Sequence, residues 1–311
     1  MDEALKKLGE SVQRLEQSGV DLIAYCGPIT IGGYHEVCDI LEQKSNEKVI
    51  LFLCTFGGDP NAGYRIARAI THHYGTDNFS IAIPTDCKSA GTLVCIAASE
   101  LIFFNKGELG PLDTQIFKQD EIFQRSSGLD LLRGMSYLNS EASKLFQNYL
   151  HDISRRGGIS TKSASEIAVN MVKGLYTPMY AQIDPLRLGE MQAALQIAFE
   201  YGTRLNDKSK SLQQDGLTRL IHEYPTHGFA IDRAEARTLF RCVNPPSEDV
   251  RTIGDLVANF IWNDGFIPRP KIFNLTKDFT QSNNGGSTDE HHGDGIPKDI
   301  EKSEDSDEPE S

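Results

Sequence analysis

Two short loops carry the residues of this 311-residue chain that are best suited to chemistry. The first is FGGDPNAG (56–63) and the second is DCKSAG (86–91), and each lies between an apolar run and a helical pattern. Glycine lets backbone N–H groups approach a ligand, and the start of a helix adds partial positive charge. A serine on such a turn is exposed, and the amide of the next residue points toward an oxyanion. We therefore expect the Gly58 and Ala90 amides to converge beside Ser89.

Each loop alone also has a simpler interpretation. The glycines can merely make a tight turn, and Ser89 can be an ordinary helix N-cap. The first loop is not a phosphate-binding P-loop, because the G-K-[ST] ending is missing. The two loops together are more informative, because both follow the carboxyl ends of adjacent parallel strands, where open α/β sheets bind ligands.

The elements that position these loops alternate between strand and helix. Apolar, β-rich runs predict buried strands at 21–27, 49–56, 79–85 and 101–105, and apolar residues at helical spacing predict helices at 34–43, 64–75 and 92–99. This alternation predicts an α/β fold around a mostly parallel sheet with right-handed crossovers.

The chain divides into three parts by composition. Residues 1–19 form an amphipathic helix, and residues 20–265 form the α/β domain, with a helical part from about 120 to 220 that would cover the sheet or pack between subunits. Residues 277–311 carry eleven acidic residues against three lysines and few apolar ones. We expect this tail to be disordered, because burial cannot offset its ordering entropy.

Composition excludes several classes of function. The net charge of −13 and the absence of a basic stripe in the sequence argue against nucleic acid as a binding partner. No apolar stretch is long enough to span a bilayer and the N-terminus has no secretory h-region, so we expect a cytoplasmic protein. The six cysteines are scattered without a C-x-x-C pair, which favours reduced thiols over a zinc site or disulfides. No cofactor motif is present, and the pairs His72-His73 and His291-His292 are expected to be solvated rather than metal ligands.

Several collinear motifs over residues 20–245 resemble the ClpP/crotonase superfamily: GPIT, VILFLCTFGGDPNAGYRIARAI, KSAGTL, ASELIFFNKGELGPLDTQ, YAQIDPLRLGE, EYGTRL and YPTHGFAIDRAEA. The chain looks most like the serine dehydrogenase proteinase branch, which is related to the signal peptide peptidase SppA. The resemblance implies a parallel sheet of repeated β-β-α units, Ser89 as nucleophile and the Gly58 and Ala90 amides as oxyanion hole. It also implies a homo-oligomer, with the helices between 120 and 220 as contacts.

The general base is less directly implied. Where ClpP has its histidine this chain carries Asp113, and where ClpP has its aspartate this chain carries His227. We infer that the two partners are exchanged, with His227 as base and Asp113 as its orienting carboxylate, in a Ser-His-Asp constellation of different chain order. A histidine suits the task because its pKa lies near operating pH.

Other assignments stay open at this stage. For the base, His227 can instead be a surface histidine, and His222 is a rival candidate. For the carboxylate, Asp113 can instead cap a turn, and Asp184 is either an alternative carboxylate or a helix N-cap. SppA-like relatives use a lysine base, for which this chain offers Lys88, Lys144, Lys162 and Lys173. Lys88 is expected to point away from the nucleophile, and the other three are more easily explained as solvated lysines.

The sequence thus predicts a serine-type peptidase that acts on protein or peptide substrates through an acyl-enzyme on Ser89. One alternative is a crotonase-like acyl-CoA enzyme, which would use the same oxyanion geometry without a serine nucleophile. The other is an inactive scaffold or binding protein that has kept the fold.

Overall fold

A six-stranded sheet forms the centre of the protein. The computed structural model describes residues 2–112, 115–117, 125–226, 228–264 and 267–278. Within these, the strand order is β10-β1-β2-β3-β5-β9, and all neighbours are parallel except β10, which runs antiparallel to β1. The strands are β1 (Val20–Cys26), β2 (Lys48–Cys54), β3 (Phe79–Ile83), β5 (Glu100–Phe103), β9 (Val243–Asn244) and β10 (Lys271–Asn274). The predicted α/β fold with a mostly parallel sheet is confirmed.

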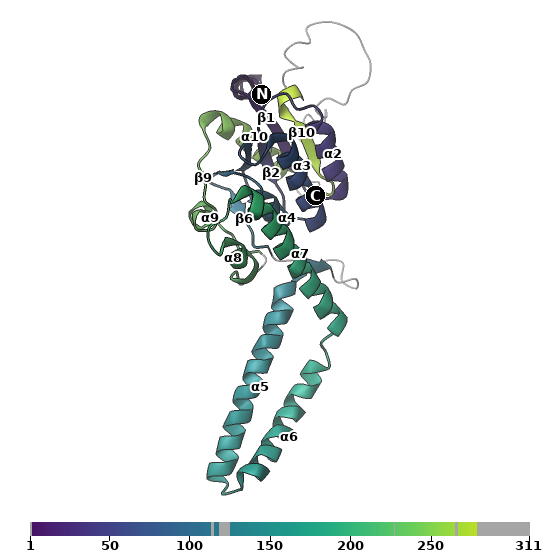
Figure 1. Ribbon diagram of the computed structural model, residues 1–311, viewed down its shortest axis with the longest axis vertical. Coiled ribbons are helices and arrows are strands. Elements are labelled where there is room, and N and C mark those ends of the chain that lie inside the picture. Colours follow the sequence, from purple (N-terminus) through teal and green to yellow (C-terminus); the bar gives the residue numbers. More distant parts are fainter. Residues whose placement is uncertain (1, 113–114, 118–124, 227, 265–266, 279–311) are drawn as a thin grey trace, which may run out of the picture.

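Helices cover both faces of this sheet (Figure 1). Alternate residues of β2 point into two separate cores, as the two-residue period of a strand requires. Leu51 and Leu53 pack in a core with α2 (Ile31–Leu41), α3 (Pro60–Tyr74) and α4 (Ala90–Cys95). Phe52 and Cys54 pack in the opposite core with α1 (Asp2–Gln17) and α10 (Glu248–Asp264). Burial on both faces explains the continuous apolar runs in the sequence.

A second set of short extended segments follows the main strands. The two-stranded parallel pair β4 (Asp86–Cys87) and β6 (Glu108–Leu109) belongs to it. So do the isolated parallel bridges between Ile29 and Gly58 and between Thr55 and Cys87. Each of these segments comes shortly after a main strand, so the chain repeats a strand, a short second strand and a helix.

The long helices form a projection and a return. Figure 1 shows α5 (Gly128–Arg156) and α6 (Thr161–Tyr180) side by side, extending away from the sheet. A short antiparallel pair, β7 (Gln115–Phe117) and β8 (Arg125–Ser127), precedes α5. Helix α7 (Pro185–Ser209) returns to pack against α3 and α4. Of the two roles expected for this half, covering the sheet or packing between subunits, α5 and α6 do not take the first, because they pack on one another, and α7 packs on the helices that cover the sheet.

Two short helices and one ion pair complete the fold. Helices α8 (Gly216–His222) and α9 (Arg233–Leu239) pack on each other, and α9 contacts β9. On the opposite face, Arg14 Nη2 lies 2.6 Å from Asp249 Oδ1 and joins α1 to α10. All six cysteines are free. Among the described residues, no helix has both the length and the apolar character needed to cross a membrane.

Candidate active site

The two loops singled out by sequence lie side by side. The Thr55 amide donates to Asp86 O at 2.8 Å, and the Lys88 amide donates to Thr55 O at 2.9 Å. The Thr55 hydroxyl in turn accepts from the Gly57 amide at 3.0 Å and fixes the glycine turn. These bonds hold the segment before Ser89 against the segment before Gly58.

Ser89 has a strained backbone and an unengaged hydroxyl. Its φ of 50° and ψ of −113° place a non-glycine residue at positive φ, which typically costs about 1–3 kcal/mol. Ser89 occupies the N-cap position of α4, but its side chain makes no capping hydrogen bond, so the hydroxyl does not serve as a helix cap. The residue is partly exposed, and a Cβ built on Gly57 would lie 3.3 Å from Ser89 Oγ. The hydroxyl therefore faces the glycine turn and not the core.

Two backbone amides beside Ser89 have no acceptor. Gly57 O accepts from the Ile29 amide at 2.9 Å, and the Asp59 amide donates to Ile29 O at 2.9 Å, but Gly58 N–H, between them, is not used. Ala90 N–H belongs to the first turn of α4 and has no intrahelical partner. Within the part of the chain that the structure describes, neither amide makes a hydrogen bond. One free donor thus directly follows Ser89, and the other directly follows Gly57, the residue that the serine hydroxyl faces.

Lys88 is buried and directed away from the serine. Its Nζ lies 2.7 Å from Glu108 Oε2, 3.7 Å from Asp86 Oδ1 and 3.5 Å from Leu109 O. Burial raises the pKa of the Asp86 carboxyl, and the Lys88 ammonium partly offsets this effect. The ion pair joins Lys88, which follows β4, to Glu108 of β6, so Lys88 is directed elsewhere than to the serine, as its position in the sequence suggested.

The two predicted partners of Ser89, Asp113 and His227, lie outside the described residues. The described segments that flank them are joined to α4 and to each other. Thr92 Oγ1 in α4 donates to Gly110 O at 2.7 Å, and the Leu112 amide donates to Leu220 O at 2.9 Å. Leu109 and Ile231 exchange two backbone hydrogen bonds of 2.9 Å. The segment that ends at residue 112 and the chain on both sides of residue 227 thus meet beside the serine helix.

The alternative bases and carboxylate are not brought to Ser89. Asp184 Oδ1 accepts from the Leu186 amide at 2.9 Å, so Asp184 is an N-cap of α7. The His222 side chain is exposed at the end of α8 and makes no hydrogen bond or ion pair within the described chain. The remaining lysines, Lys144, Lys162 and Lys173, are exposed on the α5–α6 projection.

Sequence reasoning missed Arg133, which lies near the start of α5. Its guanidinium donates to three backbone carbonyls: His222 O at 3.0 Å, Tyr224 O at 2.5 Å and Pro225 O at 2.7 Å. Arg133 therefore holds the end of α8 and the loop after it. No pattern in the sequence could have found this contact, because backbone carbonyls carry no residue-specific signal.

The described residues contain no group of three or more His, Cys, Asp or Glu side chains that could hold a metal ion. The site of this α/β protein consists of a partly exposed serine on a strained strand-to-helix turn, the unengaged Ala90 amide that follows it, and a glycine turn with the unengaged Gly58 amide. This is the arrangement used for acyl transfer on serine.

Comparison with known proteins gives the following similarities. No protein-family model and no curated protein matches the chain. Solved structures of the 1510-N membrane-bound stomatin-specific protease are similar at low identity. A serine-to-alanine variant shares 18% identity over 47% of this chain and 67% of that chain, with a TM-score of 0.27. A lysine-to-alanine variant in complex with a substrate peptide shares 16% identity over 77% of this chain and 96% of that chain, with a TM-score of 0.28.

Proposed function

We propose that this protein is a serine peptidase of the ClpP/crotonase type, which cleaves peptide bonds through an acyl-enzyme on Ser89. One observation carries the proposal: Ser89 is held at positive φ beside two free amides while its hydroxyl caps nothing. Strain of this kind persists only where the surrounding structure enforces it, and it is common at functional sites.

In the proposed reaction, Ser89 Oγ attacks the carbonyl carbon of the substrate while a base removes the hydroxyl proton. The oxygen of the tetrahedral intermediate accepts from the Gly58 and Ala90 amides. Collapse of the intermediate breaks the C–N bond, and the base returns the proton to the leaving amine. Water then attacks the ester and releases the acyl group. We assign the base to His227 and its orienting carboxylate to Asp113, and Arg133 positions the loop that precedes His227.

The surroundings of Ser89 support a peptide as substrate. Phe56 precedes the Gly57 turn and is 66% exposed, so it offers an apolar contact beside the two amides. The segment around Ile29 and Gly58 is extended backbone at the same edge, which suits a substrate that is itself extended chain. A crotonase-like acyl-CoA enzyme would use the two amides in the same way, but it would leave the strained serine without a role.

An active-site serine probe tests the proposal. A fluorophosphonate should form a covalent adduct on Ser89, identified by peptide mapping, and Ser89→Ala should abolish the labelling. Ser143→Ala, at an exposed position of α5, is the matched control and should label like the parent chain. A chain that binds an acyl-CoA without labelling would favour the crotonase alternative. A folded chain that neither labels nor binds would favour the scaffold alternative.

We further propose that the protein is a homo-oligomer of the cytoplasm. Four apolar side chains at four-residue spacing are 41–54% exposed along α6: Ile167, Met171, Leu175 and Met179. Such a stripe on a projecting helix suits contact with a second copy. Free thiols at all six cysteines suit a reducing compartment.

A further inference from the structure

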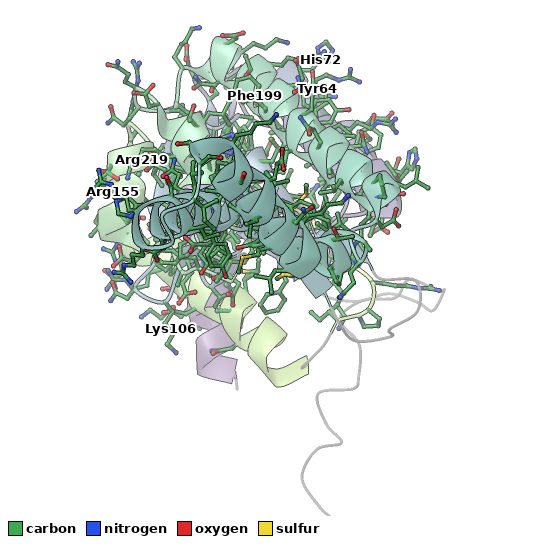
Figure 2. All side chains as sticks on the ribbon, turned by 90° about the horizontal axis from the view of Figure 1, so that it is seen from below. Tyr64, His72, Lys106, Arg155, Phe199 and Arg219 are labelled. Atoms are coloured by element: carbon green, nitrogen blue, oxygen red, sulfur yellow. The ribbon has the colours of Figure 1, made fainter. Side chains whose placement is uncertain are left out.

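A second hollow of the protein lies away from Ser89. Helices α2, α3 and α7 enclose a groove of about 700 Å³. We call it the basic groove and define it by six of its side chains: Tyr34, Arg68, His72, His73, Arg204 and Lys208. Tyr64 also lines it, and Figure 2 shows Tyr64 and His72 on the same side of the molecule.

The two histidines of the basic groove and the serine lie at opposite ends of α3. Gly63, in the first turn of α3, approaches α4 so closely that an added Cβ would lie 3.1 Å from Ala90 O. His72 and His73 are in the last turn of the same helix. With a rise of 1.5 Å per residue, nine residues of helix separate His72 from Gly63 by about 14 Å, and the groove runs along α3 from Tyr64 to these histidines. Gly58, Ser89 and Ala90 are not among the described residues that line the groove.

The charge of the groove is one-sided. No carboxylate is among the described residues that line it, although the whole chain has a net charge of −13. Arg68 and Lys208 make no hydrogen bond or ion pair with the described chain, and Arg204 has only an exposed contact of 3.8 Å with Glu200. Three cations gathered in a hollow with one exposed counter-charge favour an anionic ligand with several charges.

The chain itself contains such a ligand. Residues 279–311 hold ten acidic residues and two lysines, and seven of these acids fall within residues 299–310. Strand β10, which lies a few residues before the end of the described chain, is joined to the groove through the residues that follow α2. Asn274 Nδ2 lies 3.4 Å from Gln43 Oε1, just beyond α2, and the adjacent Lys44 Nζ donates to the carbonyl of the groove residue His73 at 2.9 Å.

We propose that the acidic segment 299–310 binds in the basic groove of its own chain. About 20 residues connect Asp278 to this segment, and a flexible chain of that length has an end-to-end distance of about 25 Å. Tethering gives an effective concentration in the millimolar range for short flexible linkers, so weak ion pairs suffice. The contact is electrostatic and weakens as salt shortens the Debye length. It does not depend on any chemistry at Ser89.

Zero-length cross-linking of the full chain tests this contact. A carbodiimide activates a carboxylate, an amine in contact displaces it as a urea, and the net product is an amide formed with loss of water. We expect mass spectrometry to find Lys208 joined to a carboxylate of residues 299–310 at low salt, with much less product near 1 M salt. The equally exposed Lys162, at the tip of the α5–α6 projection, should give no such product.

Charge reversal on one helix supplies the matched pair. Arg68→Glu should lower the Lys208 product about fivefold, since one exposed attraction is replaced by a repulsion of similar size. Arg65→Glu, on the same helix but outside the groove lining, should leave it unchanged.

Three results would overturn the proposal. One is a Lys208 product that is insensitive to Arg68→Glu. A second is a product that joins isotopically distinct chains in a mixed sample, which would assign the groove to the tail of another copy. The third is tight binding of tripolyphosphate with no tail product at any salt, which would assign the groove to a phosphate-bearing ligand from outside.

Discussion

Replacing Gly58 by alanine should separate catalysis from folding. Gly58 has a φ of +149°, and its added Cβ would lie 2.2 Å from Ile29 O and 2.7 Å from Ile29 N. An ordinary carbon–oxygen contact is about 3.3 Å, so the turn must move by about 1 Å. A shift of that size removes the Gly58 amide from a hydrogen-bonded position. Loss of one oxyanion donor costs about 2.7–4 kcal/mol, so kcat should fall about 10²- to 10³-fold.

The assay is steady-state hydrolysis of an activated ester or peptide, with thermal unfolding measured in parallel. Gly75→Ala is the control, because Gly75 also has positive φ, at +80°, but its added Cβ meets nothing within 4 Å. It should lower stability through backbone strain and leave kcat unchanged. A folded Gly58→Ala protein whose kcat stays within about threefold of the parent would refute the assigned donor.

Four further predictions concern other parts of the molecule. In denaturant titration, the Ser89→Gly protein should be about 0.5–2 kcal/mol more stable than the Ser89→Ala protein, because glycine relieves about 1–3 kcal/mol of backbone strain at residue 89 and this exceeds the entropy cost of glycine. Equal stabilities of the two variants would argue against strain at this residue. Arg133→Ala should raise the rate of backbone hydrogen exchange in the loop after α8 and slow the fluorophosphonate labelling of Ser89, because the three carbonyl contacts are lost. Added guanidinium should partly restore the labelling rate. An unchanged exchange rate would show that these contacts do not position the loop. The hydrogen bond from Arg14 lowers the pKa of Asp249. It therefore adds stability that is present above the pKa of Asp249 in the unfolded chain and is lost as pH falls through the pKa of Asp249 in the folded protein. The stability difference between the parent and Arg14→Gln should be present at pH 7 and vanish in acid, and a pH-independent difference would contradict this. Leu175→Glu should reduce the assembly mass measured by light scattering, and an unchanged mass would remove α6 from the interface.

The sheet was predictable from sequence because its strands are buried on both faces and read as uninterrupted apolar runs. Strands β9 and β10 were missed because Val243–Asn244 and Lys271–Asn274 are short edge strands. Such segments pair on one side only and need no long apolar run. The projection of α5 and α6 was also missed, since amphipathic spacing predicts a helix with an apolar face but not what that face packs on.

The candidate site was predictable as far as local backbone chemistry determines it. Glycines before one helix and a serine before the next located the two loops, and the chain geometry joined them through Thr55. The strained φ of Ser89 and the unused amides of Gly58 and Ala90 required coordinates, because both depend on hydrogen bonds from distant segments such as Ile29. Asp184 shows the opposite case, in which a possible catalytic carboxylate proves to be a helix cap.

The central claim is that Ser89 forms an acyl-enzyme, and pre-steady-state hydrolysis of a p-nitrophenyl ester tests it most directly. The proposal predicts a burst of nitrophenol close to one equivalent per chain, with the acyl mass on the peptide that contains Ser89 after acid quenching. It also predicts no burst from Ser89→Ala. Hydrolysis without a burst, at a rate that Ser89→Ala shares, would contradict the claim.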